Sequence, residues 1–176
     1  MEYNDFELLK GISAGDENAL EELVRRWYPR IYAYSLKMTG YPQDADDITQ
    51  DVFVAVLQNV RSFAPWRNFK GWLFTIAHNK CVDYFRIQRR NWTEDISGLD
   101  LSDSSPPLDE QIALADAMEN ALARLTPIQR ETVVLRYYHQ FSAIEIARIT
   151  HTPLPTVKSR LAAAKRTLSA LLKEEL

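Results

Sequence analysis

The feature that most constrains the fold of this chain is an interruption in its helical pattern. Apolar residues recur at intervals of three and four through most of the 176 residues, as in amphipathic helices. The pattern stops from Thr93 to about Pro107, in a segment rich in Ser, Asp and Pro that is typical of a linker. The sequence therefore predicts an all-α protein, with two small helical domains (residues 1–92 and 109–176) joined by an acidic flexible linker (residues 93–108).

Local signals indicate where helices begin and break. Thr126 with Gln129, and Ser142 with Glu145, have the spacing of capping boxes, in which side chain and backbone satisfy each other at a helix start. Pro29 falls inside an amphipathic pattern that runs to Gly40, and it is predicted to kink or divide that helix, because proline lacks a backbone N–H. No stretch alternates long enough to predict a sheet.

Charge is distributed in blocks along the chain. The net charge is −3, yet residues 61–92 contain seven Lys or Arg and one acid, and residues 155–173 contain five Lys or Arg and no acid. Residues 93–120 contain eight acids and no Lys or Arg. Basic islands in an acidic chain are typical of phosphate binding, although solvated helix faces are the alternative.

The first basic island combines two kinds of side chain that rarely share a helix. Residues 69–92 contain six aromatic residues and five Lys or Arg. A core helix would not carry five cations, and a fully solvated helix would not carry two tryptophans. One side of this helix is predicted to be buried and consists of Leu73, Ile76, Ala77, Cys81, Tyr84 and Phe85. The other side is predicted to meet a molecule outside the protein.

The second basic island has the layout of a helix-turn-helix. A short apolar helix at residues 143–149 is followed by a tight connection and a basic helix. The inward stripe of the basic helix is Val157, Leu161, Ala164 and Leu168. Thr156, Lys158 and Ser159 then point outward near its start, where a recognition helix meets base edges. A plain helical hairpin with a solvated basic face is the alternative.

Three segments in order, "DADDITQDVFVAVLQNVRSF", "FKGWLFTIAHNKCVDYFRIQRR" and "LTPIQRETVVLRYYHQFSAIEIARITHTPLPTVKSRL", resemble the extracytoplasmic-function sigma factors. This family is the small, two-domain class of bacterial transcription initiation factor, and the resemblance covers about Asp5 to Leu172. It implies a protein that binds core RNA polymerase and directs promoter recognition, DNA melting and transcription initiation. The implied partners are the beta-prime clamp helices and beta flap of the polymerase, promoter DNA, and an anti-sigma factor.

The resemblance also implies roles for residues of the first domain. The helix face that binds the clamp helices corresponds to Asp47, Gln50 and Asp51, which share one face at i, i+3 and i+4. The minus-ten DNA contacts correspond to Phe63, Trp66, Arg67, Asn68, Lys70, Asn79, Lys80, Arg86, Arg89 and Arg90. Aromatic side chains stack on unpaired bases, cations follow the phosphate backbone, and an Asn amide offers both a donor and an acceptor to a base edge.

In the second domain, the resemblance implies a reader of the minus-thirty-five element. Its DNA contacts correspond to Thr156, Lys158, Ser159, Arg160, Lys165 and Arg166. The chain departs from the family where Pro155 replaces a frequent Gly, and where Ala162 and Ala163 replace bulky or basic residues. Short side chains reach fewer base edges, so the sequence read by this helix stays open.

Two other classes of protein compete with this interpretation. A stand-alone helix-turn-helix regulator would leave the aromatic and basic helix and the Asp47 face unexplained. An enzyme or metalloprotein would have to use His78, Cys81, His139 and His151, but the sequence lacks CxxC, HExxH and glycine-rich phosphate motifs. We therefore expect neither catalysis, nor a cofactor, nor a metal.

Cysteine content and hydropathy indicate the cellular compartment. The chain has one cysteine, which suits a reducing cytoplasm, and no apolar run of membrane length, so no membrane insertion is expected. The sequence leaves open whether the two domains pack together in the free protein.

Overall fold

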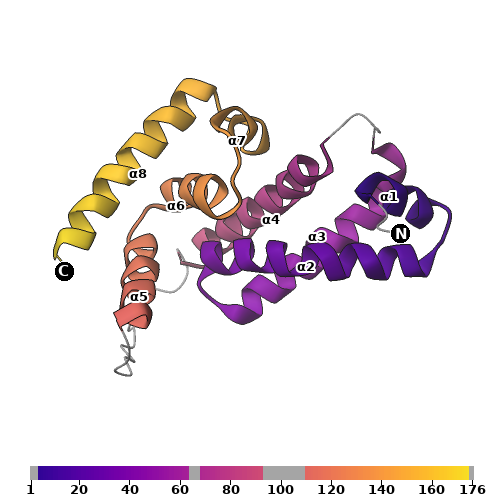
Figure 1. The fold of residues 1–176 in the computed structure, drawn as a ribbon, viewed down its shortest axis with the longest axis horizontal. Coiled ribbons are helices and arrows are strands. Elements are labelled where there is room, and N and C mark those ends of the chain that lie inside the picture. The colour runs from indigo at the N-terminus through magenta and orange to yellow at the C-terminus, as the bar shows by residue number, and fades with distance from the viewer. Residues whose placement is uncertain (1–3, 64–67, 93–109, 175–176) are drawn as a thin grey trace.

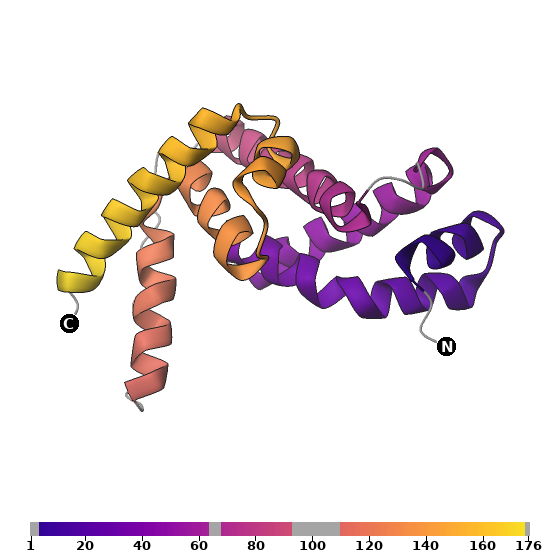
Figure 2. The same cartoon turned by 45° about the horizontal axis from the view of Figure 1, so that its top comes forward.

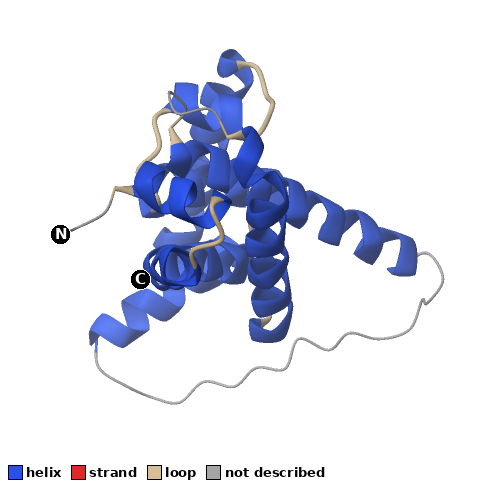
Figure 3. Ribbon diagram, turned by 90° about the vertical axis from the view of Figure 1, so that its right-hand side faces the viewer, coloured by secondary structure: helices blue, strands red, loops and turns tan. Residues whose placement is uncertain are grey.

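The computed structural model describes residues 4–63, 68–92 and 110–174, with side chains described for residues 4–63, 68–88 and 117–171. These residues form helices and, within those ranges, no strand, as the sequence predicts (Figures 1 and 3). The predicted linker lies outside them. In chain order the elements are α1 (Asp5–Ser13), α2 (Glu17–Thr39), α3 (Pro42–Asn59), the 3-10 turn η1 (Val60–Ser62), α4 (Phe69–Trp92), α5 (Glu110–Ala123), α6 (Pro127–Val133), the π-helical turn η2 (Val134–Tyr138), α7 (Ala143–Ile149) and α8 (Leu154–Glu174).

The N-terminal domain consists of α1 to α4, with α2, α3 and α4 packed on one another and α1 packed on α2. The buried stripe of α2 repeats every three or four residues and consists of Leu23, Trp27, Ile31, Tyr34 and Met38, each at most 4% exposed. Burial of each such side chain contributes about 1.5–3 kcal/mol. The opposite side of α2 carries the charged residues, which explains why this sequence forms an amphipathic helix.

Pro29 does not divide α2, which runs without interruption from Glu17 to Thr39. Trp27 and Ile31 on either side of the proline are both buried against the same core. Their packing offsets the backbone hydrogen bond that proline cannot donate. Of the kink or division expected at Pro29, division is therefore wrong, because tertiary packing outweighs the local preference.

The C-terminal domain packs α5 and α6 against α8, with α7 and α8 forming the helix-turn-helix. Its own small core contains Leu122, Leu125, Val133 and Ala164. Both predicted capping boxes are present, at the starts of α6 and α7. The connection between α7 and α8 is tight, since the Thr152 N–H donates to the Ala147 carbonyl at 3.0 Å.

The two domains pack against each other. A single buried cluster continues from the N-terminal helices into Val134, Leu135, Phe141, Ile146, Ile149 and Val157 of the C-terminal domain. Helix α7 lies against α4, and α6 and η2 lie against α2 (Figure 2). The question that the sequence left open is thus answered for this structure: the chain is closed.

Candidate polymerase and nucleic-acid interfaces

The predicted polymerase-binding residues lie together on the exposed face of α3. Asp47, Gln50 and Asp51 are all exposed. The Gln50 amide donates to Asp46 Oδ2 at 2.8 Å, and Asp51 Oδ2 lies 3.8 Å from the Lys80 ammonium of α4. The face is therefore acidic, accessible and tied at one edge to the neighbouring helix.

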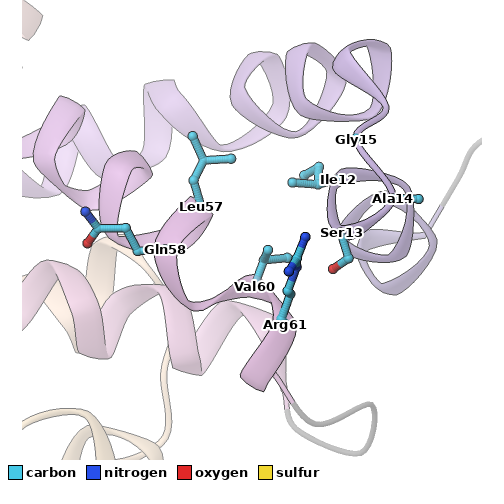
Figure 4. A pocket seen from close by; sticks show the side chains of 8 residues that line it. All are labelled: Ile12, Ser13, Ala14, Gly15, Leu57, Gln58, Val60 and Arg61. Atoms are coloured by element: carbon cyan, nitrogen blue, oxygen red, sulfur yellow. The ribbon is translucent and has the colours of Figure 1, made fainter.

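The same face of α3 continues into apolar residues that the sequence analysis did not single out. Val54 and Leu57 are 50% and 42% exposed, and they follow Gln50 and Asp51 at helical spacing. Leu57 also lines a groove of about 450 Å³ between the α1–α2 connection and the end of α3, opposite Ile12 and Ser13 (Figure 4). The signal that would have found them is the i+3 and i+4 continuation of the acidic face.

The predicted minus-ten residues fall into several environments. Phe63 is half-buried, with its ring centroid 4.9 Å from that of Trp72 and 5.9 Å from that of Phe69. Asn68 is exposed and accepts a hydrogen bond from the Gly71 N–H at 3.4 Å, at the start of α4. Outside the described side chains lie Trp66, Arg67, Arg89 and Arg90.

Lys70 is engaged by the other domain. Its ammonium donates to the His139 carbonyl at 2.5 Å and lies 4.4 Å from the centroid of the Phe141 ring. Burial, together with the nearby Arg30 guanidinium, lowers the pKa of Lys70. In this arrangement its charge faces the C-terminal domain.

Farther along α4, the predicted residues are accessible. Asn79 is exposed, and Arg86 is exposed with its guanidinium 2.9 Å from Asp83. Lys80 is half-buried beside Asp51. Val82 is 49% exposed on the same helical face as Asn79 and Arg86, and sequence reasoning missed it.

The predicted minus-thirty-five residues occupy the outer face of α8. Thr156, Lys158, Ser159, Lys165 and Arg166 are exposed, whereas the predicted inward residues Val157 and Ala164 are fully buried. Arg160 is half-buried and donates to Thr152 Oγ1 at 3.2 Å, which ties α8 to the turn before it. The helix-turn-helix geometry is thus present, and its outer face is open.

A buried polar cluster joins the domains, and sequence reasoning missed it. Glu131 of α6 is only 8% exposed, and its Oε1 accepts a hydrogen bond from the Tyr34 hydroxyl at 2.6 Å and lies 2.6 Å from His78 Nδ1. Burial, with Glu131 beside it, raises the pKa of Tyr34 well above its usual range. The available signal was an acid directly before the apolar run "TVVL".

The same cluster shows the surroundings of two residues that were considered for an enzyme or metal site. His78 contacts the Glu131 carboxylate, and Cys81 is buried at 2% exposure, where burial raises the pKa of its thiol. Among the described residues, no three His, Cys, Asp or Glu side chains are grouped to hold a metal ion. His78 and Cys81 lie in the interior rather than at an open site.

Comparison with known proteins places this architecture in a family. The Sigma-70 region 2 model matches residues 23–91, and the Sigma-70 region 4 model matches residues 115–168. The ECF RNA polymerase sigma factor SigM of Mycobacterium tuberculosis is 32% identical to this chain, over 97% of the chain and 86% of SigM. The chain belongs to the ECF sigma factor family. Sigma factors of this family bind bacterial core RNA polymerase and direct promoter recognition, DNA melting and transcription initiation.

Solved structures extend the comparison to the arrangement of the whole chain. CnrH, in its complex with the cytosolic domain of CnrY, matches this ECF sigma factor with a TM-score of 0.73 and 27% identity, over 98% of this chain and 99% of CnrH. RpoE of Bartonella quintana, in complex with the anti-sigma factor NepR, matches with a TM-score of 0.70 and 26% identity, over 87% of this chain and 96% of RpoE. The stand-alone regulator is not favoured, because both sigma regions match.

As a sigma factor, the chain is a DNA-binding transcription initiation factor, a class of protein that is not catalytic. Within the part of the chain that the structure describes, no helix combines the length and apolar character needed to cross a bilayer.

Proposed function

We propose that the two domains of this sigma factor divide the work of initiation. Residues 1–92 bind core polymerase and recognise and melt the minus-ten element, residues 93–108 connect the domains, and residues 109–176 read the minus-thirty-five element. The support is the separation of an acidic face on α3 from a basic outer face on α8. The protein acts in the cytoplasm, without catalysis and without a cofactor.

The observation that carries the proposal is the adjacency of two exposed faces in the N-terminal domain. Asp47, Gln50 and Asp51 of α3 receive cationic side chains of the beta-prime clamp helices. Asn79 and Arg86 of α4 meet the separated non-template strand. Because α3 packs on α4 and the Lys80 ammonium lies 3.8 Å from Asp51, polymerase binding and minus-ten reading share a rigid element.

The remaining residues of these surfaces follow the same division. On the minus-ten side the DNA contacts are Phe63, Trp66, Arg67, Asn68, Lys70, Lys80, Arg89 and Arg90. On the minus-thirty-five side, Thr156, Lys158 and Ser159 approach base edges, whereas Arg160, Lys165 and Arg166 contact phosphates, which position the helix without specifying sequence. The C-terminal domain also contacts the beta flap.

An anti-sigma factor that keeps the protein inactive is part of the proposal. Support comes from the RpoE–NepR complex, in which a structurally similar sigma factor is bound to an anti-sigma factor. The apolar residues Val54 and Leu57 next to the acidic α3 face give such an inhibitor a surface on which it would compete with polymerase.

The test of the proposal is transcription of fragmented genomic DNA from the host by core polymerase, with and without the protein, followed by sequencing of the RNA 5′ ends. We expect new start sites that share two spaced upstream elements. Absence of such starts, with polymerase that is active on another sigma factor, would contradict the proposal.

A charge-reversal variant assigns the polymerase face. Asp47→Lys with Asp51→Lys is expected to weaken binding to core by about 30-fold or more, because two attractive pairs become repulsive. The matched control is Glu17→Lys with Glu21→Lys, which reverses two exposed acids on α2. Equal affinity of the two variants for core would remove the α3 assignment.

A further inference from the structure

The contact between the domains has a polar centre that is costly to build. A buried carboxylate is stable only when hydrogen bonds or an opposite charge compensate its lost hydration. Glu131 comes from the C-terminal domain, whereas both of its partners, Tyr34 and His78, come from the N-terminal domain, 97 and 53 residues away in sequence. These compensating groups are available to Glu131 only when the domains are closed. We call Glu131, Tyr34 and His78 the interdomain lock.

Beside the lock, one loop of the C-terminal domain inserts its side chains into the N-terminal domain. The loop, residues 139–141, turns at Gln140, whose φ of 59° lies in the left-handed region. The ring centroids of His139 and Phe141 lie 4.6 Å and 5.0 Å from that of Phe74. We call residues 139–141 the interdomain knob.

Closing affects residues proposed to contact DNA. The ammonium of Lys70 binds the knob through the His139 carbonyl and the Phe141 ring. Asn68, directly before α4, lines a cleft of about 630 Å³ together with Trp72 of α4, and Glu145 and Arg148 of α7 line the same cleft. Lys70 therefore cannot contact a DNA strand and the C-terminal domain at the same time, and α7 lies across the cleft from Asn68.

We propose that the closed packing is an autoinhibitory contact, in which the interdomain lock holds the knob on Lys70 and so withholds the start of α4 from minus-ten DNA. The effect on minus-ten DNA rests on the function proposed above, whereas closure of the domains by the interdomain lock does not. Release of Glu131 to water separates the domains and returns Lys70 to solvent. Promoter opening then requires this release.

The test keeps the Glu131 charge but removes its partners. In Tyr34→Phe with His78→Leu, the carboxylate is buried without compensation, and the open population is expected to rise about 100-fold or more. Adding Glu131→Leu removes the charge, and this triple variant is expected to close again, because an apolar side chain replaces a buried ionic group at little cost. The recovery separates loss of the lock from loss of folding.

Two readouts follow the opening without reference to DNA. Pulsed EPR measures the distance between spin labels at Glu21→Cys and Ser169→Cys, both exposed, while the native Cys81 is buried and escapes labelling. Mass spectrometry measures the rate at which Lys70 is acylated, with exposed Lys158 as the internal reference. We expect a broad distance distribution and an acylation rate of Lys70 raised about tenfold or more in the double variant, and wild-type values in the triple variant.

A double variant that keeps one narrow spin-label distance would contradict the proposed role of the interdomain lock. A triple variant as open as the double variant would contradict it too. Transcription with core polymerase supplies the functional arm, in which the opened variant is expected to form open complexes faster than wild type. Opening without that gain would overturn autoinhibition. If neither protein supports transcription, the proposed sigma activity fails while the two structural readouts still decide the lock.

Discussion

The two surfaces that we propose to read DNA differ in what covers them. On α8, Thr156, Lys158 and Ser159 are exposed along the outer face of the helix-turn-helix. On α4, Asn79 is equally exposed, but Lys70, near the start of the helix, is bound to the C-terminal domain. The helix proposed to read duplex DNA is thus exposed in the free chain, whereas Lys70, near the start of the helix proposed to read single-stranded DNA, is covered.

This difference teaches that the residues of α4 proposed to contact DNA alternate along the helix with residues that pack against the other domain. Phe74 is fully buried and contacts Tyr34 of its own domain and Phe141 of the other. Lys70 lies one helical turn earlier on the same side. The proposed closing mechanism can therefore act on the proposed DNA contacts of α4, whereas the outer face of α8 stays exposed in the closed form.

The largest expected effect comes from Phe74, which packs against side chains of both domains. Phe74→Ala is expected to destabilise the protein by about 3–5 kcal/mol, because it removes a buried ring and leaves a cavity. Thermal and chemical denaturation would measure the loss. Val157→Ala, a buried position within α8, is the control and is expected to cost less, since it deletes fewer buried atoms. A smaller loss of stability for Phe74→Ala than for Val157→Ala would show that Phe74 is not a main packing residue between the domains.

Acid should open the closed form through His139. Burial, together with Lys70 of α4 and Arg30 and Lys37 of α2, lowers the pKa of His139 from 6.5 to about 4. The open form therefore binds this proton more tightly, and closing weakens as the pH falls from 6.5 towards 4, by about 2 kcal/mol at pH 5. The distance between spin labels, recorded from pH 7 to pH 5, checks this.

Two substitutions isolate the contribution of His139 to this pH dependence. His139→Phe keeps an aromatic ring against Phe74 and is expected to remove the His139 share of the response. His151→Asn changes an exposed histidine and is expected to leave that response intact. An unchanged pH response in His139→Phe would show that other groups govern opening.

A smaller effect is expected from the exposed part of α4. Asn79→Ala should reduce strand opening or minus-ten discrimination about tenfold, because a proposed amide hydrogen bond to a base edge, of roughly 1–3 kcal/mol, is lost. Its stability should change by less than about 0.5 kcal/mol, since the side chain is exposed. Permanganate footprinting of the promoter, alongside a melting curve, distinguishes the two. A large drop in thermal stability would make Asn79 a structural residue.

The smallest effect concerns the cap of α7. Ser142 accepts the Glu145 N–H at 3.2 Å, and Ser142→Ala is expected to cost about 1 kcal/mol of stability. The backbone N–H of residue 142 still lowers the pKa of Glu145 in this variant, but loss of the Ser142 hydroxyl bond should raise that pKa part of the way back. The matched control is Asn4→Ala at the start of α1, a cap in the same type of box. Because α7 packs on α4, only Ser142→Ala should also increase acylation of Lys70.

Most of the fold could be predicted because its signals are local. The capping box of Ser142 and Glu145 spans one turn of chain, and the stripe of Val157 and Ala164 follows from the helical period, so both are legible in sequence. Pro29 is the exception, because its effect depends on what packs against the neighbouring turns.

The lock and the capture of Lys70 could not be predicted from the sequence. Glu131 meets Tyr34 across 97 residues, and no periodicity records which face of one domain meets which face of another. The roles of Asp47, Asn79 and Lys158 in binding remain predictions, for which the structure supplies accessibility and spacing.

The π-helical turn η2 has a consequence for evolution by insertion and deletion. The His139 N–H donates to the Val134 carbonyl at 3.2 Å, five residues back, so this turn holds one residue more than an α-helical turn. Because the wide turn absorbs that residue, deleting one residue from Val134–Tyr138 would restore an α-helical turn and leave the following chain pointing in about the same direction. Winding the same number of residues into a regular α-helix would instead turn His139 and Phe141 by about 100° about the helix axis, and the domains would uncouple while every side chain proposed to contact DNA stayed the same.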